Sequence, residues 1–428
     1  MSVNVYDRFP NCLVVGEGAV KTIGDHIRKF GEIKRVAVIT DQGLKSLPIV
    51  TDLIDILRAQ GFEVSLFGDV RSLPTDRNVL ELVEKMKDFG AEAVVAIGGG
   101  SAMDCARAAN ALYSYGGTLE EHNISRQKYS YSRNVLKPCF AVPTTAGTGC
   151  EVAAGCGIIK TDPITGEGVD FYIVSAKQMI PDVSIIDPLM SISLNPATTA
   201  ATGMDALTHA YESMVSLNDF PLAAGLSLEA IYLVLQNLRA AVTGGGDIRA
   251  RENMAIAATT ATVSFQLCKL GLVHAISEGL SAFALIPHGV ANAILLPKVM
   301  EFNAPCVPDK MVRVAAAMGI NTFELSEQQA AARAVEEVKS LMRDIEMPFT
   351  FTEYLNQREK EQPEIFRPIS RKAVDMSLKL AMESSFIQTN PRTAAVEDIE
   401  AMLDKQFAGY RFSATKALAT NSMLTTPS

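Results

Sequence analysis

Residues 93–104 read AVVAIGGGSAMD, a short apolar run that leads directly into three glycines and then into a helical pattern. An uninterrupted run of small and β-branched residues is typical of a buried parallel strand. Glycines before a helix let the backbone approach a ligand closely, and the helix start offers free N–H groups. The stretch therefore predicts an α/β fold with a phosphate-binding turn at Gly98, Gly99, Gly100 and Ser101, with Asp104 one turn along the helix.

A plain helix start is the alternative for this turn. Ser101 would then be the N-cap of the helix, and Asp104 would complete a variant of the capping box. Both interpretations place the turn between a strand and a helix.

Four other short runs have the same apolar character, and amphipathic stretches such as residues 78–89 lie between most of them. This alternation predicts a parallel sheet with helices on both faces, a Rossmann-like dinucleotide-binding α/β domain that we assign to residues 1–191. A hairpin formed by residues 156–160 and 169–174 interrupts the pattern and is expected to cover the mouth of the sheet. The four runs are Val36–Thr40, Val64–Phe67, Cys139–Val142 and Val183–Ile186.

The second half of the chain has a different composition. Beyond Asp187 and Pro188 the strand pattern stops, and the sequence becomes rich in Ala, Leu, Met and Glu at helical spacing. We therefore expect an all-α metal-binding domain over residues 192–428, whose first helix begins at Asn195 and Pro196, a favourable N-cap and N1 pair. Residues 408–428, rich in Ser, Thr and Ala, are expected to form a loosely packed extension.

A second polar loop follows the next strand, where residues 143–151 read PTTAGTGCE. Open α/β sheets bind ligands beyond the carboxyl ends of their strands, so this loop adds Thr144, Thr145 and Thr148 to the predicted cofactor site. Asp41 follows the first strand, and its carboxylate could bind a ribose 2'-hydroxyl and repel a 2'-phosphate, which favours NAD over NADP. Asp41 could equally be no more than a turn former.

Five histidines occur in 428 residues, and three of them follow a pattern suited to a divalent metal. Asp205 and His209 are four residues apart, which places them on one face of a helix. His274 and His288 would complete a shell of three imidazoles and one carboxylate. Such a shell fits Fe(II), Zn(II), Co(II) or Mn(II).

The composition excludes several functional classes. A net charge of -9 and a pI near 5.3 argue against a nucleic-acid-binding protein. The N-terminus lacks a signal-peptide pattern, and no apolar run reaches the roughly 20 residues of a membrane span, so we expect a cytoplasmic protein without a membrane partner. Seven scattered cysteines without a C-x-x-C pair indicate reduced thiols. His26 and His122 lie among charged residues and are expected to face solvent.

These motifs resemble the iron-containing, or group III, alcohol dehydrogenase family from about Tyr6 to Phe407. The resemblance implies an NAD-binding α/β domain, a helical domain and an active site between them. It places the metal ligands at Asp205, His209, His274 and His288, with Fe(II) expected and Zn(II) as the alternative. We also expect a homo-oligomer, at least a dimer. The motifs that carry the resemblance are GGGS with Asp104, residues 143–151, Ile186–Pro188, Gly203–His209, His274, Pro287–Ala293 and Thr389–Arg392.

The chain departs from the family pattern where typical members have a second His, four residues after the first. Here the residue is Glu278, which we predict to be a catalytic group, as a proton acceptor or an extra ligand. It could instead be satisfied by local hydrogen bonds. Lys269, the second predicted catalytic residue, could neutralise Glu278 or bind an anionic substrate group, or be a solvated surface residue. Other departures are Leu73 for Asn, Arg107 for Lys, Cys150 for Ser, and Lys269 for Gly.

The resemblance and the metal pattern imply a metal-dependent oxidoreductase that interconverts a small primary alcohol and its aldehyde with NAD(H). A second hypothesis is a metal- and NAD-dependent lyase similar to dehydroquinate synthase. A third is a catalytically altered family member with an assembly or sensing role. The complete set of four predicted ligands favours an active enzyme, and net accumulation of NADH with an alcohol would separate the first hypothesis from the second.

Overall fold

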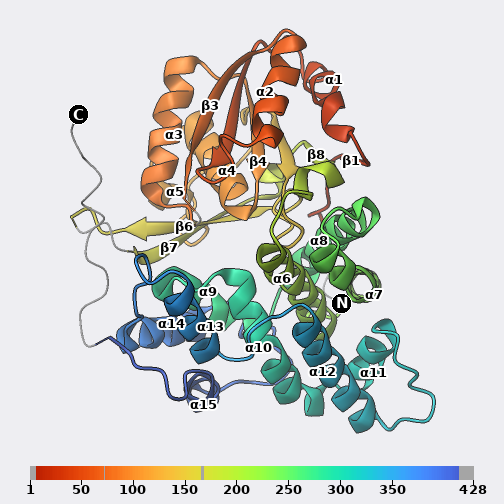
Figure 1. The fold of residues 1–428 in the computed structure, drawn as a ribbon. Helices are drawn as coiled ribbons and strands as arrows, with labels where there is room; N and C mark the ends of the chain where they lie inside the picture. The colour runs from red at the N-terminus through yellow and green to blue at the C-terminus, as the bar shows by residue number, and fades with distance from the viewer. Residues whose placement is uncertain (1–5, 72, 165–167, 414–428) are drawn as a thin grey trace, which may run out of the picture.

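The computed structural model describes residues 6–71, 73–164 and 168–413 of the chain. It has two halves (Figure 1): a parallel sheet flanked by helices forms the N-terminal half, and a group of packed helices forms the C-terminal half. The predicted fold class is therefore confirmed. The predicted division between residues 191 and 192 falls in the link between the last strand, which ends at Ile186, and the helix that begins at Pro196.

The sheet has six parallel strands in the order β1-β8-β5-β4-β2-β3. The central strands β4 and β5 are buried at every residue, which explains why their sequences show no polar alternation. All five predicted strands are confirmed. The strands are β1 (Leu13–Val15), β2 (Arg35–Asp41), β3 (Glu63–Val70), β4 (Ala93–Gly98), β5 (Cys139–Pro143) and β8 (Val183–Ile186).

Helices cover both faces of this sheet (Figure 1). One hydrophobic core joins the sheet to α3 and α4, and a second core on the other face joins it to α1 and α2. This is the doubly wound arrangement that the alternating pattern predicts. The helices of this half are η1 (Ala19–Thr22), α1 (Ile23–Arg28), α2 (Pro48–Ala59), α3 (Asp76–Phe89), α4 (Gly100–Tyr115), α5 (Leu119–His122), η2 (Lys177–Met179) and η3 (Pro188–Ser191).

The predicted hairpin is confirmed as an antiparallel pair, β6 (Gly155–Thr161) and β7 (Gly168–Ser175). β6 contacts α4 and α3, and the Ile159 N–H donates to the Pro74 carbonyl at 2.9 Å. β7 contacts α5 and, in the other half of the molecule, α9 (Leu272–Ala284). The hairpin thus lies between the two halves, as Figure 1 shows.

The helical half is built around α6, which is buried along most of its length and packs against α7, α8 and α10. Asn195 accepts the N–H of Thr198 at 2.8 Å, and Pro196 is the first helical residue, so the predicted helix start is confirmed. The helices are α6 (Pro196–Val215), α7 (Pro221–Thr243), α8 (Ile248–Cys268), α9 (Leu272–Ala284), α10 (His288–Asn303), η4 (Ala304–Cys306), α11 (Pro308–Ala317), α12 (Glu327–Asp344), α13 (Phe351–Glu361), α14 (Arg371–Glu383) and α15 (Val396–Gln406).

Among the described residues, α7 is the single helix that is long and apolar enough to cross a membrane. The pair α8 and α9 passes the same test only across a bend of 109°. Core helices of globular proteins pass this test too, and α7 packs against α6 and α8, so the finding is weak evidence for a membrane span. Most of the predicted C-terminal extension, residues 414–428, lies outside the described residues.

The prediction that His122 faces solvent is wrong. Its side chain is fully buried, with Nδ1 2.5 Å from the Tyr131 hydroxyl and Nε2 2.8 Å from the Gly116 carbonyl. The ring also stacks on Tyr129. Charged neighbours in sequence do not fix the orientation of a residue at the end of a four-residue helix, because its side chains point in all directions. His26 is partly exposed on α1.

Candidate active site

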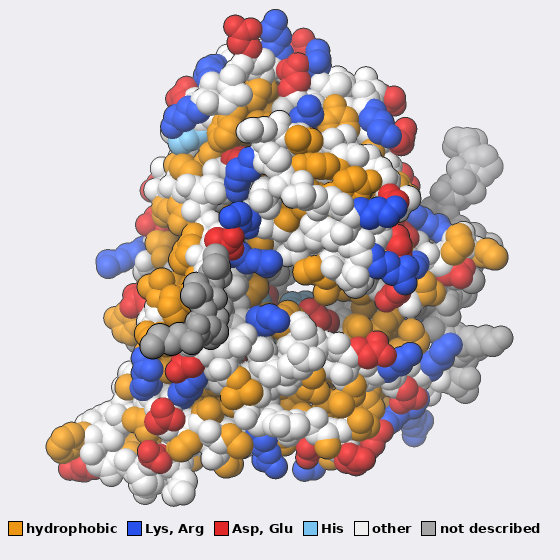
Figure 2. Space-filling view, turned by 180° about the vertical axis from the view of Figure 1, so that it is seen from behind, with side chains coloured by type: hydrophobic (Ala, Val, Ile, Leu, Met, Phe, Trp, Pro, Cys, Tyr) orange, Lys and Arg blue, Asp and Glu red, His pale blue; other side chains and the backbone are white. Residues whose placement is uncertain are grey.

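A cleft of about 1940 Å³ lies between the two halves, and Figure 2 shows the molecule hollowed there when it is seen from behind. One wall consists of the loops after β2, β4 and β5, and the other includes the start of α6 and residues 287–290. Parallel sheets bind ligands at this edge. The predicted site residues that line the cleft are Asp41, Gly99, Gly100, Ser101, Thr144, Thr145, Thr148, Asp205 and His288.

The glycine turn is a tight connection between β4 and α4. Gly98 has a φ of +150°, and a Cβ on it would lie 2.8 Å from the Cβ of Ala102, so a larger residue would disrupt the turn. Because α4 starts at Gly100 with Gly99 as its N-cap, the alternative in which Ser101 caps the helix is wrong. The first N–H groups of α4 therefore lie at the cleft, where they can bind an anion.

The threonine loop lies directly beside this turn. A Cβ on Gly99 would lie 3.3 Å from Oγ1 of Thr145, and one on Gly100 would lie 3.1 Å from Oγ1 of Thr148. The loop is held from the helical half, because the Thr262 hydroxyl on α8 donates to the Thr148 carbonyl at 3.2 Å. Backbone N–H groups and threonine hydroxyls thus surround one point of the cleft, which suits a phosphate.

Asp41 has a structural role that leaves one carboxylate oxygen for another use. Its Oδ1 accepts the N–H groups of Gly43 at 2.9 Å and Leu44 at 3.1 Å, so the turn-forming interpretation is correct. Its Oδ2 faces Gly98, where an added Cβ would lie 3.4 Å away. Burial raises the pKa of Asp41, and the two backbone N–H groups oppose that effect. The predicted ribose contact can therefore coexist with the turn.

Asp104 is not among the residues that line the cleft. Its carboxylate lies 2.6 Å from the guanidinium of Arg107 and accepts the Gly157 N–H at 2.9 Å. Arg107 is itself buried and also donates to the carbonyls of Ala153 and Gly155. The pair ties α4 to the start of the hairpin, and the predicted contact of Asp104 with the cofactor stays a prediction.

The structure brings all four predicted metal ligands together. Nε2 of His209, His274 and His288 lies 3.8, 3.7 and 3.7 Å from Oδ1 of Asp205. The ligand atoms of Asp205, His209 and His274 lie within 4.8 Å of one another. Four ligands about 2.0–2.2 Å from one ion in a tetrahedral site are about 3.3–3.6 Å apart. These side chains thus have the donor types and nearly the spacing that a divalent ion requires.

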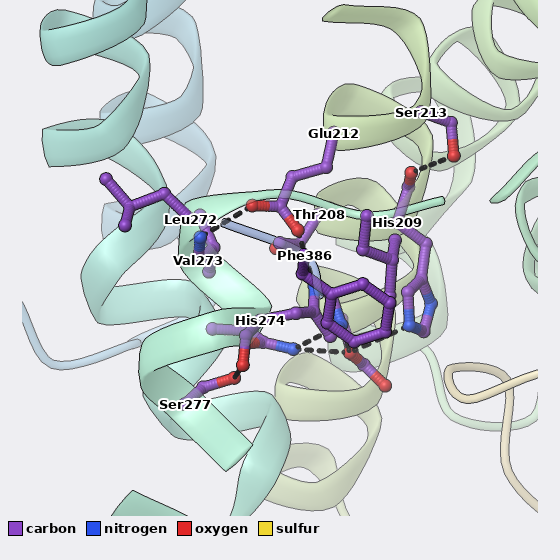
Figure 3. A network of polar contacts seen from close by, with 12 residues as sticks. Thr208, His209, Glu212, Ser213, Leu272, Val273, His274, Ser277 and Phe386 are labelled. Carbon is purple, nitrogen blue, oxygen red and sulfur yellow. Dashed lines mark hydrogen bonds and ion pairs between the residues drawn. The ribbon is translucent and has the colours of Figure 1, made fainter. Parts of the chain in front are cut away.

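A fifth buried residue, Glu212, holds one of these imidazoles in place (Figure 3). Its Oε2 lies 2.6 Å from Nδ1 of His274, and its Oε1 accepts the Val273 N–H at 2.6 Å. A hydrogen bond from Nδ1 to a carboxylate leaves Nε2 to bind a metal. The sequence interpretation missed Glu212. Its spacing, seven residues after Asp205 and three after His209, is a detectable signal because it places the carboxylate on the same helix face.

The protonation states of the cluster follow from burial and from the neighbouring charges. Burial lowers the pKa of His209 to about 3, and it also lowers the pKa of His288, so both imidazoles are neutral at neutral pH. Burial acts in the same direction on His274, but the carboxylates of Asp205 and Glu212 raise its pKa to about 9. Although burial alone would raise the pKa of Asp205, the imidazoles hold it below its usual range.

Asn292 lies in the middle of this cluster and was also missed. Its Nδ2 donates to Oδ1 of Asp205 at 2.7 Å and lies 3.2 Å from Nε2 of both His274 and His288. Its Oδ1 is buried and has no partner among the described residues. When His274 is neutral and its Nδ1 donates to Glu212, three acceptor atoms surround an amide that has only two N–H bonds. The cluster has more lone pairs than its own donors can satisfy, which fits a cation-binding site.

Glu278 lies on α9 one turn beyond His274, which places it on the same helix face. The residue is half-buried and makes no hydrogen bond or ion pair with any residue that the structure describes. Burial raises its pKa to about 7, with His274 opposing the shift and Glu212 adding to it. The alternative of a carboxylate satisfied by local hydrogen bonds is therefore wrong.

Lys269 is the C-cap of α8 and is exposed to solvent. It makes no ion pair with Glu278, so the structure does not join the two predicted catalytic residues. Its φ of 65° and ψ of 171° belong to a region that is essentially restricted to glycine. This backbone conformation explains why the family resemblance leads us to expect glycine at this position. A catalytic role for Lys269 stays a prediction.

Comparisons with known proteins agree with this site. A family model described as iron-containing alcohol dehydrogenase matches residues 10–188, and one described as the Fe-containing alcohol dehydrogenase family, C-terminal, matches residues 199–407. The chain is 34% identical to a 1,3-propanediol dehydrogenase of Klebsiella pneumoniae over 417 residues, which are 95% of this chain and 100% of the relative.

Two further similarities point in the same direction. The chain is 31% identical to an NAD-dependent methanol dehydrogenase of Bacillus methanolicus over 394 residues, 92% of this chain and 97% of the relative. A crystal structure of 1,3-propanediol oxidoreductase superimposes with a TM-score of 0.84 at 31% identity, covering 94% of this chain and 100% of that one. Because these proteins are dehydrogenases, the lyase alternative is not favoured.

Proposed function

Because the chain belongs to the iron-containing alcohol dehydrogenase family, we propose that it interconverts a small primary alcohol and its aldehyde with NAD(H) and one divalent metal ion. The observation that carries the proposal is the convergence of Asp205 with three imidazoles at a cleft whose opposite wall carries the glycine turn. A nucleotide and a metal-bound substrate could therefore meet in one enclosed space.

The N-terminal wall of the cleft would bind the nucleotide. In this proposal the N–H groups at the start of α4 bind the pyrophosphate, and the hydroxyls of Thr144, Thr145 and Thr148 add hydrogen bonds. Oδ2 of Asp41 binds the ribose, and its charge disfavours a 2'-phosphate. NAD(H) is therefore the proposed cofactor.

The helical wall would hold the metal through Asp205, His209, His274 and His288. Fe(II) is the proposed ion on the basis of the family, and three imidazoles with one carboxylate suit Zn(II) as well. When bound there, the ion would supply Lewis-acid chemistry and NAD(H) would supply the hydride donor or acceptor.

In this proposal the residues of the chain hold the metal ligands in position, shield the site from water and provide a proton acceptor. Asp205 and His209 are fixed on one helix, and Glu212 orients His274 through the 2.6 Å hydrogen bond to Nδ1. The ring centroid of Phe265 lies 4.9 Å from that of His209, and that of Phe386 lies 6.5 Å from that of His274; we propose that these apolar rings limit the access of water. We propose that the Glu278 carboxylate acts as a proton acceptor at this site.

The direct test is net redox turnover by metal-loaded protein. Protein reconstituted under anaerobic conditions with Fe(II) or Zn(II) is expected to form NADH from short primary alcohols or diols, and to consume NADH with the corresponding aldehydes. The same reactions with NADP(H) are expected to be much slower. The absence of NADH formation and consumption in protein of verified metal content would contradict the proposal and favour an assembly or sensing role.

The matched control is His274→Ala, which removes a ligand from a buried position. It should lose both metal and activity while its far-ultraviolet circular dichroism spectrum is unchanged. Full NAD-linked activity in metal-free His274→Ala protein would also contradict the proposal.

We further propose a cytoplasmic homo-oligomer, at least a dimer, that acts without nucleic-acid or membrane partners. Support comes from the net charge of -9, which disfavours nucleic-acid binding. The molar mass in solution, measured by light scattering, should be at least twice 46.0 kDa. A monomer at micromolar concentration would contradict this part of the proposal.

A further inference from the structure

Glu278 is a half-buried carboxylate without a partner, one helical turn from a metal ligand. It makes no hydrogen bond or ion pair within the described residues, although most charged groups in such positions are paired. Burial disfavours its ionised form, as the raised pKa of about 7 indicates. A positively charged ligand group beside Glu278 would offset the free-energy cost of ionising this carboxylate.

The charges around the metal ligands do not provide such a group. Asp205 and Glu212 are both buried, and their two negative charges would balance the two positive charges of a divalent ion. His209, His274 and His288 must all be neutral when they bind a metal. Glu278 therefore adds one net negative charge to the loaded site.

No lysine or arginine in the described part of the chain forms an ion pair with Glu278. Lys269, the nearest lysine or arginine in sequence, is exposed and forms no ion pair with Glu278. Among the described residues, the arginine and lysine ion pairs all involve other acids. The described residues thus leave this carboxylate without a cationic partner, so a cationic group of a bound molecule can pair with it.

Aromatic rings stand beside the same imidazoles. The ring centroid of Phe265 lies 4.9 Å from that of His209, and Phe386 meets His274 edge-on at 6.5 Å. Figure 3 shows Phe386 next to His274. Aromatic faces attract ammonium groups, and the attraction is stronger where water is excluded. A carboxylate combined with aromatic rings suits a cation and repels an anion.

On the basis of the proposed function, we infer that Glu278 is a specificity-determining residue: it favours alcohols and aldehydes that carry an ammonium group and disfavours those that carry a carboxylate or sulfonate. For neutral alcohols of the same shape, kcat/KM should lie between the values for the cationic and the anionic substrates. This assignment narrows the substrate class, which the metal and cofactor sites alone leave open.

A matched pair of alcohols tests the inference. 2-(Trimethylammonio)ethanol and 3,3-dimethylbutan-1-ol have the same shape and differ in charge. Wild-type enzyme loaded with Fe(II) should prefer the cation in kcat/KM by about tenfold or more, a size typical of one well-placed charge. In Glu278→Gln the ratio should fall toward one. Glu278→Asp keeps the charge and should retain part of the preference, and Glu229→Gln, an exposed acid on α7, should retain all of it.

A binding measurement makes the test independent of turnover. Tetramethylammonium, titrated calorimetrically into metal-loaded protein, should bind wild type about tenfold more tightly than Glu278→Gln. Iron content, measured for both proteins, should be equal. Loss of iron from Glu278→Gln would overturn the inference, because it would assign Glu278 to the metal shell.

The two proposals fail in different ways. If wild type oxidises the neutral alcohol with no preference for the cation, or if the preference survives in Glu278→Gln, only the inference about Glu278 is overturned. If wild type oxidises neither alcohol, the proposed function fails, and the tetramethylammonium titration still decides whether Glu278 forms a cation site.

Discussion

The carboxylate of Glu212 joins the two helices that carry three of the predicted metal ligands, because it lies 2.6 Å from Nδ1 of His274 and also accepts the Val273 N–H at 2.6 Å. Glu212 belongs to α6 and His274 to α9. A negative charge at the start of a helix is favourable, so the same group stabilises α9 and orients its imidazole. The geometry of the ligand set therefore depends on a residue that is not itself a ligand.

Replacing Glu212 by Gln should weaken metal binding by about 10- to 100-fold, because the neutral amide is a poorer acceptor for both N–H groups. Competition with a chelator of known affinity measures the effect. Glu229→Gln is the control, since Glu229 is exposed on α7. If Glu212→Gln bound metal as tightly as wild type, the orienting role of Glu212 would be wrong.

Metal should stabilise the folded protein, because the complete cluster exists only in the native state. At an ion concentration of about a thousand times Kd, the free energy of unfolding should increase by about 4 kcal/mol. Thermal unfolding of chelator-treated protein, with and without added Zn(II), measures it. Asp205→Asn should lose most of this gain, whereas Asp52→Asn, an exposed site on α2, should keep it. A full metal-dependent shift in Asp205→Asn would count against the four-ligand site.

Lys269→Gly should stabilise the protein by about 1 kcal/mol, because glycine adopts positive φ without the steric cost of a Cβ. The φ of 65° at this position is the reason for the expectation. Urea unfolding followed by circular dichroism measures the change. Lys269→Ala is the informative control, since it removes the charge and retains the strain; equal stabilisation by Ala and Gly would show that the charge is responsible.

Glu278 should make the stability of the metal-free protein depend on pH. Burial raises its pKa from 4.5 to about 7 on folding, so the unfolded chain ionises first as pH increases. The stabilising contribution of Glu278 to the free energy of unfolding is fully present below pH 4.5 and is lost progressively up to about pH 7. Glu278→Gln should therefore become more stable relative to wild type across this interval. Thermal unfolding at several pH values tests this, and parallel curves for the two proteins would refute it.

The main elements of the fold could be predicted because buried parallel strands require uninterrupted apolar runs, as in β4 and β5. Strand β1 could not, since it has three residues and Leu13 and Val15 are exposed at the sheet edge. The convergence of Asp205, His209, His274 and His288 could be predicted because histidine is rare in this chain and the spacing of Asp205 and His209 suits a helix.

The residues around the ligands were harder to predict. Glu and Asn are common on helices, so Glu212 and Asn292 are distinguished only by the helix face that they share with a ligand. The contacts of Asp104 were also missed: its carboxylate binds the Arg107 guanidinium and accepts the N–H of Gly157 in the hairpin, 53 residues along the chain. The roles of these three residues depend on partners that are distant in sequence, which a local sequence pattern does not reveal.

Helix α6 extends from the rim of the cleft to the centre of the ligand cluster, and its Thr198, Thr202 and Asp205 all line the cleft. A helix rises about 1.5 Å and turns by about 100° per residue. The number of residues in this stretch therefore fixes both the distance and the rotation between the nucleotide wall and the predicted ion site. One residue inserted into this stretch would rotate Asp205 out of the shell. Over evolution the length of this segment should thus be fixed, while the surface loops between later helices can grow or shrink.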